Sequence, residues 1–430
     1  MERRKFLQKT GLALGAASIL PSFVSGQSQA LSLNNWAQIR EQFVLTKDRI
    51  HMAQMLLASH PAPVREAIEK HRRQFEENSV EYWESNFMTA EEIVKKAAAS
   101  YLKCDPEEIA LTDSTTMGLA TLYCGLKLKE GDEILTTTHD HYSTEKSLEY
   151  AAQKNKASIK RITLFDDPAL VEVDAIVEKL TKAIKPNTRI IAVTWVHSST
   201  GVKLPIREMT AAVKRINTQR DENTRIYFCV DGVHGFGIED ITMEELGCDF
   251  FAAGTHKWAF GPRGTGILWG KKDAWNMITP SIPSFGLPYG VWLGLVPEEQ
   301  VTFAHHLTPG GFHSFEHRWS LNTAFDFLQQ IGKSKIQART YELNTMLKNG
   351  LKEIGHVKLH TPMDPKLSCA INTFEVAGMA PELVIEKLYK KKIVGSTTPY
   401  REVYARLTPC IINNEEEVKT CLTAIENIRT

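Results

Sequence analysis

The sequence predicts an α/β fold in which a mainly parallel sheet lies between helices. From about residue 91, short apolar segments alternate with amphipathic helical patterns, as expected for parallel strands joined by crossover helices. The apolar segments are almost continuous, for example at residues 225–230 and 250–253, which is typical of strands buried on both faces. Near residue 310 the alternation gives way to one long helical stretch and a smaller α+β portion, so we expect a second domain there.

The alternation can be followed along the chain. Helices are predicted at residues 91–102, 173–184, 205–216 and 318–331. Strands are predicted at residues 109–112, 132–137, 158–162, 189–194, 225–230, 250–253 and 264–270. After a signal at residues 1–26, the predicted domains are residues 27–310, which hold an N-terminal segment and the large domain, and residues 311–430, the small C-terminal domain.

The composition limits the classes of function. The 430 residues carry no formal net charge and no basic cluster, which argues against nucleic-acid binding as the main task. No run of eighteen apolar residues follows the first thirty positions, so we expect no membrane span in the mature chain. Seven scattered cysteines form no Cys-x-x-Cys pair, which disfavours a zinc site and a disulfide framework.

The first 26 residues are typical of a bacterial twin-arginine export signal. Arg3 and Arg4 precede Lys-Phe-Leu, an apolar stretch follows at residues 11–20, and Val-Ser-Gly at residues 24–26 is suited to cleavage. Glu2 departs from the Ser or Thr common at its position. A membrane anchor or a chance amphipathic helix is the alternative. We therefore expect the twin-arginine machinery to bring the folded protein to the periplasm or otherwise out of the cytoplasm.

Two motifs follow consecutive predicted strands. Asp231-Gly232 follows residues 225–230, and His256-Lys257 follows residues 250–253. Taken singly, the first is usually a turn and the second a solvated loop. Their positions at strand ends, where an open α/β sheet binds its ligand, favour one joint site. Pyridoxal phosphate needs such a pair: a lysine for the Schiff base and an acid that keeps the pyridinium nitrogen protonated.

A phosphate anchor is predicted where the strand at residues 109–112 leads into a helix. Ser114, Thr115 and Thr116 offer hydroxyl groups beside the free N–H groups at the start of that helix, a combination suited to a dianionic phosphate. Simple N-capping of the helix by Ser114 or Thr115 is the alternative.

Two more strand ends can complete the site. His139 and His141 follow residues 132–137, and an imidazole there can stack on the pyridine ring; a metal site of both histidines is the alternative, although no third ligand is identifiable nearby. Ser198 follows residues 189–194 and can reach the phenolic oxygen of the ring or the substrate.

In combination these motifs resemble the class V aminotransferase family of fold-type I pyridoxal-phosphate enzymes, and in particular its isopenicillin N epimerase-like members. The resemblance extends over about residues 50–428 and rests on Asp-Gly-Val-His at 231–234, Thr-His-Lys at 255–257 and Gly-Pro-Arg-Gly-Thr-Gly at 261–266. It implies a large domain whose mainly parallel seven-stranded sheet lies between helices, a smaller α+β C-terminal domain and a homodimer.

The resemblance also implies roles for single residues. It makes Lys257 the Schiff-base lysine and Asp231 the partner of the pyridinium nitrogen, with His141 stacked on the ring. The other cofactor contacts that it implies are His234 and Ser198 near the phenolic oxygen, and His256, Thr115, Ser114 and Thr116 at the phosphate. The displaced Lys257 is then a candidate general base, and we expect nearby positive charge and partial burial to lower its pKa.

Near the C-terminus, Arg406 resembles the family's arginine that binds the substrate carboxylate, which a guanidinium can grip with two parallel hydrogen bonds; a surface ion pair is the alternative. Three departures stand beside this match. Glu316 and His317 precede Arg318 where relatives have Gly-Thr, which puts a cross-subunit phosphate contact in doubt. The loop at residues 395–400 lacks the cysteine of desulfurases, and Ser198 replaces an asparagine.

The expected function is an exported enzyme that acts at the α-carbon of an amino acid, first of all an aminotransferase. An epimerase or lyase of the isopenicillin N epimerase type is the alternative, and added oxo acid distinguishes the two, since only a transaminase needs it. A non-catalytic exported binding protein is a third hypothesis. It predicts decay of the lysine site, yet Lys257, Asp231 and His256 are all present.

Overall fold

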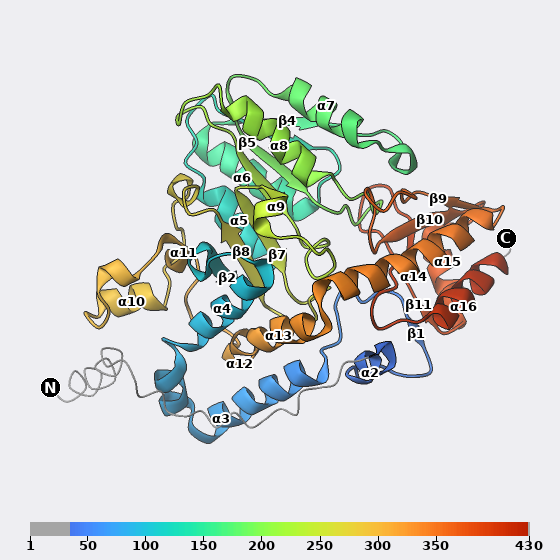
Figure 1. Cartoon of the computed structure of the whole chain (residues 1–430), viewed down its shortest axis with the longest axis horizontal. Helices are drawn as coiled ribbons and strands as arrows, with labels where there is room; N and C mark the ends of the chain where they lie inside the picture. The colour runs from blue at the N-terminus through green and yellow to red at the C-terminus, as the bar shows by residue number, and fades with distance from the viewer. Residues whose placement is uncertain (1–34, 429–430) are drawn as a thin grey trace.

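The computed structural model describes residues 35–428, and its centre is a seven-stranded sheet (Figure 1). The strand order is β2-β8-β7-β6-β5-β3-β4. The bounds are β2 Ile109–Thr112, β3 Glu133–Thr137, β4 Ser158–Ile162, β5 Thr188–Thr194, β6 Tyr227–Asp231, β7 Phe250–Gly254 and β8 Gly266–Gly270. Strands β3 to β7 pair in parallel, whereas β8 is antiparallel to both of its neighbours. The predicted mainly parallel sheet is confirmed.

Helices cover both faces of this sheet, because its strands are apolar on both sides. Along β5, Ile191 and Val193 face one hydrophobic cluster, while Ile190 and Ala192 face the other. The first cluster includes residues of α4 (Ala90–Leu102), α7 (Val173–Ala183), α8 (Ile206–Asn217) and α13 (Leu321–Ile331); the second includes residues of α5 (Thr115–Gly125) and α6 (Tyr142–Asn155). The alternating side chains thus give the sheet two cores.

The helical stretch predicted at residues 318–331 is two helices, so that prediction was wrong in its continuity. Helix α12 (Phe315–Trp319) ends and α13 begins at Ser320, whose hydroxyl donates to the carbonyl of Glu316 at 2.6 Å. Such a bond from a serine to the carbonyl four residues earlier competes with the backbone pattern of a helix. Both helices pack against α3 (Ala62–Asn86) and α4.

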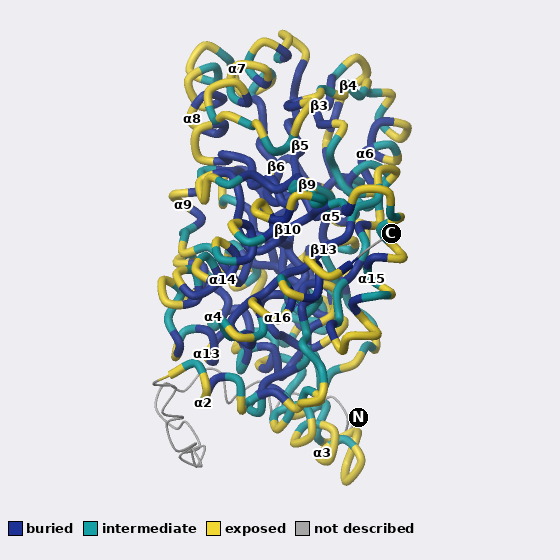
Figure 2. The backbone as a smooth tube through the Cα atoms, turned by 90° about the vertical axis from the view of Figure 1, so that its right-hand side faces the viewer, coloured by how far each residue is buried: buried dark blue, intermediate teal, exposed yellow. Residues whose placement is uncertain are grey.

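The C-terminal part has an antiparallel sheet of its own. Strands β12 (Ser396–Thr397), β13 (Ala405–Leu407), β10 (Asn372–Val376) and β9 (Val357–Leu359) pair in this order beside α14 (Lys333–Glu353), α15 (Pro381–Lys390) and α16 (Glu415–Glu426). A two-residue strand near the start, β1 (Ile50–His51), pairs in parallel with β11 (Ile393–Val394). Figure 2 draws β5, β6 and most of β10 as buried, and Phe374 and Val376 of β10 belong to a third hydrophobic cluster, with residues of α14, α15 and α16.

The remaining helices of residues 35–428 are all short. They are α2 (Trp36–Glu41), α9 (Met243–Leu246), α10 (Leu287–Trp292), α11 (Phe303–His306), and the short 3₁₀ turns η2 (Pro106–Glu108), η3 (Pro168–Leu170), η4 (Trp275–Met277) and η5 (Glu298–Gln300). Among residues 35–428, no helix is both long enough and apolar enough to cross a membrane. The predicted export signal, residues 1–26, lies outside the described residues.

Close packing explains the glycine that follows Asp231. A Cβ atom on Gly232 would lie only 1.9 Å from the Phe251 ring of the neighbouring strand. Glycine is therefore required where the chain leaves β6, and it keeps the end of this strand close against β7. The adjacent carboxylate of Asp231 is fixed by this packing at the edge of the sheet where the candidate site lies.

Candidate active site

The carboxyl ends of four parallel strands and one strand of the C-terminal sheet meet at a single site. His141 follows β3, Ser198 follows β5, Asp231 ends β6 and Lys257 follows β7, while Arg406 comes from β13. Burial and polar contacts, described below, bring these side chains together. This is the edge at which parallel α/β sheets bind ligands.

The Lys257 amine is surrounded by few groups that stabilise its charge. Its Nζ atom lies 3.3 Å from Nε2 of His234. Burial is the main cause that lowers the pKa of Lys257, to about 8, and the positive charge of Arg406 also lowers this pKa, whereas Asp231 raises it. About a tenth of this lysine is therefore an uncharged, nucleophilic amine at pH 7, and about half at pH 8.

Asp231 is a buried acid with weak hydrogen bonding from the protein. Its side chain is 2% exposed, accepts from the backbone N–H of Val233 at 3.3 Å, and lies 3.5 Å from the Thr144 hydroxyl. Burial raises the pKa of Asp231 to about 6. A cationic N–H placed against this carboxylate would stabilise its ionised form more than the protein alone does.

His141 is fixed in orientation by its own helix. It caps the N-terminus of α6, where its Nδ1 accepts from the backbone N–H of Ser143 at 3.2 Å. The Ser143 hydroxyl in turn lies 3.0 Å from the hydroxyl of Thr116. Because Nδ1 accepts, the neutral ring carries its proton on Nε2. The predicted stacking residue is thus linked through Ser143 to Thr116, one of the predicted phosphate residues.

The predicted phosphate residues gather at the N-terminus of α5. Ser114 caps that helix by accepting from Met117, as the capping alternative expects. Thr115 accepts from the N–H of Gly254 at 2.7 Å. Nδ1 of His256 is buried without a hydrogen-bond partner among the described residues, which makes it an available donor or acceptor for a ligand.

Gly254 allows the end of β7 to lie close to Thr115 at the start of α5. A Cβ atom at this position would lie 2.9 Å from the Thr115 hydroxyl oxygen and 3.0 Å from Cε1 of His256. The end of β7 and the start of α5 can be this close only because the residue between them has no side chain.

Arg406 is buried without an acidic partner among residues 35–428. The side chain is 1% exposed, and its Nε, Nη1 and Nη2 atoms donate to Ser396 Oγ at 3.1 Å, to the Ser198 carbonyl at 2.7 Å and to the Thr397 carbonyl at 3.2 Å. Burial lowers the pKa of Arg406 to about 10. Of the five N–H donors of a guanidinium, two remain, one on each terminal nitrogen, which is the arrangement that binds a carboxylate.

Two further residues of the site could not be identified from the sequence. The phenol of Tyr400 lies 2.9 Å from the Ser198 hydroxyl, and its ring stands edge-on to His141 at 5.8 Å. The loop at 395–400 attracts attention in the sequence only through its missing cysteine. The second residue is Trp258, whose indole N–H donates to Nδ1 of His234 at 3.1 Å.

Asp140 connects the ends of β3 and β5. Nothing in the sequence singles it out between His139 and His141. Its carboxylate accepts from the backbone N–H of Thr194 at 2.6 Å and of Thr137 at 3.0 Å. These bonds tie the end of β3 to the end of β5. The distance between His141 and Ser198 therefore depends on this buried contact.

His139 takes no part in the site. Its ring stacks on Phe165 at 3.9 Å, and its Nε2 accepts from the N–H of Leu164 at 3.2 Å. In the part of the chain that the structure describes, no group of three or more His, Cys, Asp or Glu side chains could bind a metal ion. All seven cysteines are free thiols, and none lies in the loop at 395–400.

The segment that departs from the family pattern carries an ion pair. Arg318 is 2% exposed and donates to Glu91 at 2.9 Å and to Asp113, the residue before Ser114. His317 instead donates from Nδ1 to the carbonyl of Arg263 at 2.9 Å. Within one chain, the bond from Arg318 to Asp113 therefore holds the residue that precedes the predicted phosphate residues.

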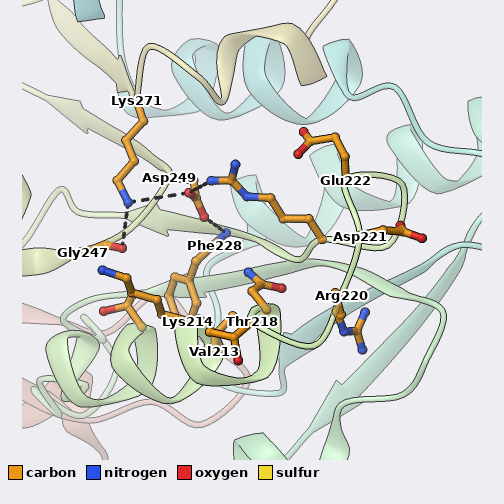
Figure 3. Close-up of a pocket in the computed structure, with 13 residues that line it drawn as sticks. Val213, Lys214, Thr218, Arg220, Asp221, Glu222, Phe228, Gly247, Asp249 and Lys271 are labelled. Atoms are coloured by element: carbon orange, nitrogen blue, oxygen red, sulfur yellow. Dashed lines mark hydrogen bonds and ion pairs between the residues drawn. The ribbon is translucent and has the colours of Figure 1, made fainter.

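A second hollow lies at the opposite end of β6 and β7 (Figure 3). It measures about 380 Å³ and is lined by charged side chains. Asp249 pairs there with Arg225 at 3.1 Å and Lys271 at 3.7 Å, and it accepts from the N–H of Phe228. Because Asp249 is paired with protein groups, this hollow is a structural charge cluster, away from the carboxyl ends of the strands where the candidate site lies.

Comparison with known proteins supports one family. The family model described as "Aminotransferase class-V" matches residues 58–397. A probable cysteine desulfurase of Pyrococcus abyssi is 24% identical over 405 residues, 91% of this chain and 96% of the relative. The isopenicillin N epimerase of Amycolatopsis lactamdurans is 26% identical over 290 residues, 66% of this chain and 70% of the relative.

Solved structures share the fold. A mutant of C-DES with glycine covalently linked to its pyridoxal-phosphate cofactor superposes with a TM-score of 0.79 at 21% identity, and the match covers 91% of this chain and 99% of the other. The cysteine desulfurase of Thermococcus onnurineus gives a TM-score of 0.76 at 21% identity, over 91% and 97% of the two chains. The predicted fold class is confirmed by these structures.

Asp231 should make the cofactor-free protein less stable at neutral pH. The pKa of this carboxyl is higher in the folded chain, about 6, than its ordinary value of 3.8, so stability falls as the pH rises from about 4 to about 6. We expect Asp231→Asn to increase the free energy of unfolding at pH 7 by about 1–3 kcal/mol and to change it little at pH 4.

Denaturant unfolding at the two pH values measures this effect. Asp166→Asn is the control, since that side chain is 91% exposed and its loss should change stability little at either pH. A loss of stability at pH 7 in Asp231→Asn would contradict the expectation.

Proposed function

Because this chain belongs to the aminotransferase class-V family, we propose that it is an enzyme acting at the α-carbon of an α-amino acid. The family's cofactor is pyridoxal phosphate. Each half of the proposal rests on residues of the site: the cofactor on Lys257 and Asp231, and the substrate on Arg406.

The donor set of the site fits pyridoxal phosphate. Lys257 supplies a buried amine with a lowered pKa for covalent attachment, and Asp231 supplies a buried carboxylate for the pyridinium nitrogen. His141 offers an oriented ring face. At the phosphate end, the start of α5 offers N–H groups and hydroxyls beside Nδ1 of His256, which has no partner in the described chain, as anion sites at helix N-termini do.

Bound pyridoxal phosphate supplies an electron sink for bonds that break at the α-carbon. The protein contributes the remaining functions. The Lys257 amine, once released, can take up a proton, since its pKa of about 8 lies near neutral pH. The further candidates for cofactor contacts are Ser198, Thr115, Thr116, Ser114 and His234.

Arg406 is the observation that carries the substrate class. A guanidinium that is 1% exposed and has no acid beside it in the described chain is costly to keep charged. A substrate carboxylate bound to the two remaining N–H groups would compensate this charge. The carbonyls of Thr397 in β12 and of Ser198 after β5 hold the guanidinium in place. The unpaired charge of Arg406 supports an α-amino acid with a free carboxylate as the substrate class.

Two reactions are compatible with this site. The sequence favours transamination, and the family name agrees. The relatives favour elimination or epimerisation, because they include desulfurases and an isopenicillin N epimerase. Persulfide formation on a loop cysteine is disfavoured, since Tyr400 occupies the loop at 395–400 and no cysteine does. We therefore carry an epimerase or lyase as the second candidate beside the aminotransferase.

Substrate turnover with and without an oxo acid separates the two candidates. The purified enzyme is given a panel of L- and D-amino acids in ²H₂O, with or without pyruvate or 2-oxoglutarate. A transaminase should form product only when oxo acid is present, whereas an epimerase or lyase should exchange the α-hydrogen, invert the centre or release a β-substituent without it. Lys257→Ala should abolish these reactions and the visible absorption band of the holoenzyme; turnover by this variant would contradict the proposal.

Arg406→Gln should raise KM for α-amino acids by about 10²-fold or more, because a buried charge-assisted pair is lost. Amines without a carboxylate should be affected far less. Arg401→Gln, which changes an exposed arginine just after the same loop, is the control. An equal effect of both substitutions on KM would assign carboxylate recognition to another residue.

We also propose export by the twin-arginine route, on the Arg3-Arg4 motif, the apolar stretch at residues 11–20 and the small residues at 24–26. The test is the cellular fraction in which the full-length protein and a variant lacking residues 1–26 accumulate. Export of the shortened protein would contradict this assignment.

A homodimer is a further part of the proposal. Phe312 and Trp292 are each 79% exposed, and Phe312 stacks on Trp83, whose indole N–H is buried without a partner in the described chain. Large exposed aromatic groups beside an unsatisfied donor are typical of an interface. The mass of the holoenzyme in solution, against 48.4 kDa for one chain, measures the state.

A further inference from the structure

His234 is contacted at both ring nitrogens by two consecutive residues. The indole N–H of Trp258 donates to Nδ1 at 3.1 Å, and Nζ of Lys257 lies 3.3 Å from Nε2. The imidazole and the indole are both buried, with 4% and 2% of their surfaces exposed. Water therefore has little access to either contact, and each must be satisfied within the protein.

The first contact determines the second. An indole nitrogen can only donate, so Nδ1 of His234 must be an unprotonated acceptor. A neutral imidazole then carries its proton on Nε2, which makes Nε2 a donor towards Lys257. Nζ can accept that bond only through a lone pair, and a lysine has one only as a neutral amine.

The opposite arrangement is disfavoured by the same count of donors and acceptors. If Lys257 were an ammonium group, Nε2 would have to accept and Nδ1 would carry the proton. Two N–H groups, those of Nδ1 and of Trp258, would then face each other across 3.1 Å. The bond from Trp258 and the charged form of Lys257 thus compete through the imidazole.

We propose that Trp258 is a positioning residue that fixes the tautomer of His234 and thereby favours the uncharged form of the Lys257 amine, which is the form that reacts in covalent attachment. The tryptophan acts only through the imidazole. In the same tautomer, Nε2–H is the donor that His234 can present to the cofactor.

The other charged groups around Lys257 do not give this effect by themselves. Arg406, from β13, opposes the ammonium form, and Asp231, from the end of β6, favours it. His141, at the N-terminus of α6, is neutral by the hydrogen bond that it accepts. His256 lies beside Lys257 in the chain, and its pKa is lowered by burial and by that lysine. Among these side chains, the one within hydrogen-bond distance of the Lys257 amine is that of His234.

Trp258→Phe keeps an aromatic ring and removes the N–H. Without it, His234 is free to accept from an ammonium group, so the pKa of Lys257 should rise from about 8 towards its ordinary value. A protein hydrogen bond of typical net strength corresponds to a roughly two- to twelvefold change in the fraction of neutral amine. We expect the reactivity of Lys257 at pH 7 to fall by this factor.

The chain offers a matched control. Trp275 is 3% exposed, and its indole N–H has no hydrogen-bond partner among the described residues. Trp275→Phe therefore makes the same chemical change at a buried tryptophan of the sheet's other hydrophobic cluster without removing a hydrogen bond, and it should leave the pKa of Lys257 unchanged.

The experiment starts from the full-length holoenzyme, from which the cofactor is removed reversibly. Acetylation of Lys257 by limiting acetic anhydride, followed by mass spectrometry over a series of neutral to alkaline pH values, gives the pKa of its amine in the wild type and both variants. A higher pKa in Trp258→Phe, with Trp275→Phe and wild type alike, supports the proposal. Equal pKa values in all three proteins overturn it.

A second measurement does not depend on the variants folding. Proton–nitrogen NMR of ¹⁵N-histidine-labelled wild type, with the His234 signals assigned by comparison with His234→Gln, shows which ring nitrogen carries the proton. Protonation at Nε2 supports the proposal, and protonation at Nδ1 overturns it. The proposal rests on the proposed function only for the role of Lys257, and because neither readout needs turnover, a failed substrate panel would leave it standing.

Discussion

Burial of charge is the constraint on which the site depends. Asp231 and Lys257 lie at the ends of adjacent strands inside a core, and burial moves the pKa of each towards its neutral form, to about 6 and about 8. Within residues 35–428, the protein places no strong partner against either group: the contacts of Asp231 are long, and Lys257 meets an imidazole. The structure therefore has unused binding capacity, which a cofactor with a basic ring nitrogen and an aldehyde can use.

Burial of charge also applies to Arg406, where the C-terminal sheet meets the large sheet. Ser198 links the two: its carbonyl accepts from Arg406, and its hydroxyl binds Tyr400. The loop that carries Tyr400 is closed at its base, because Thr398 donates to Tyr404 through its backbone N–H at 3.0 Å and accepts from the N–H of Tyr404 through its hydroxyl at 2.9 Å. A phenol and a guanidinium are thus presented to the site by short, firmly bonded segments.

The sequence predicted the fold and the centre of the site because both follow from local patterns. Continuous apolar segments identify strands buried on both faces. Asp231 follows one such segment directly, and Thr115 and Lys257 each follow another within a few positions. The helical stretch at residues 318–331 was predicted without its break, since the bond of the Ser320 hydroxyl to Glu316 depends on a choice of rotamer that the pattern does not show.

Trp258, Tyr400 and Asp140 could not be assigned in this way. The role of Trp258 requires His234, 24 positions earlier, to lie edge-on to its ring, and Tyr400 meets Ser198 across 202 positions. Asp140 binds the backbone of β5 from the end of β3. Such contacts arise from the packing of strands and sheets, and nothing in the nearby sequence encodes them.

The pairing of β1 with β11 bears on when the site can form during synthesis. Ile50 and His51 pair with Ile393 and Val394, and Met52 accepts from the backbone N–H of Thr408, two residues after Arg406. A segment that is synthesised early therefore pairs with segments that are synthesised more than 300 residues later. The arginine can reach its place only after almost the whole chain has left the ribosome, whereas the strand ends that carry Asp231 and Lys257 are complete much earlier. Synthesis thus supplies Asp231 and Lys257, the cofactor half of the site, before Arg406 of its substrate half.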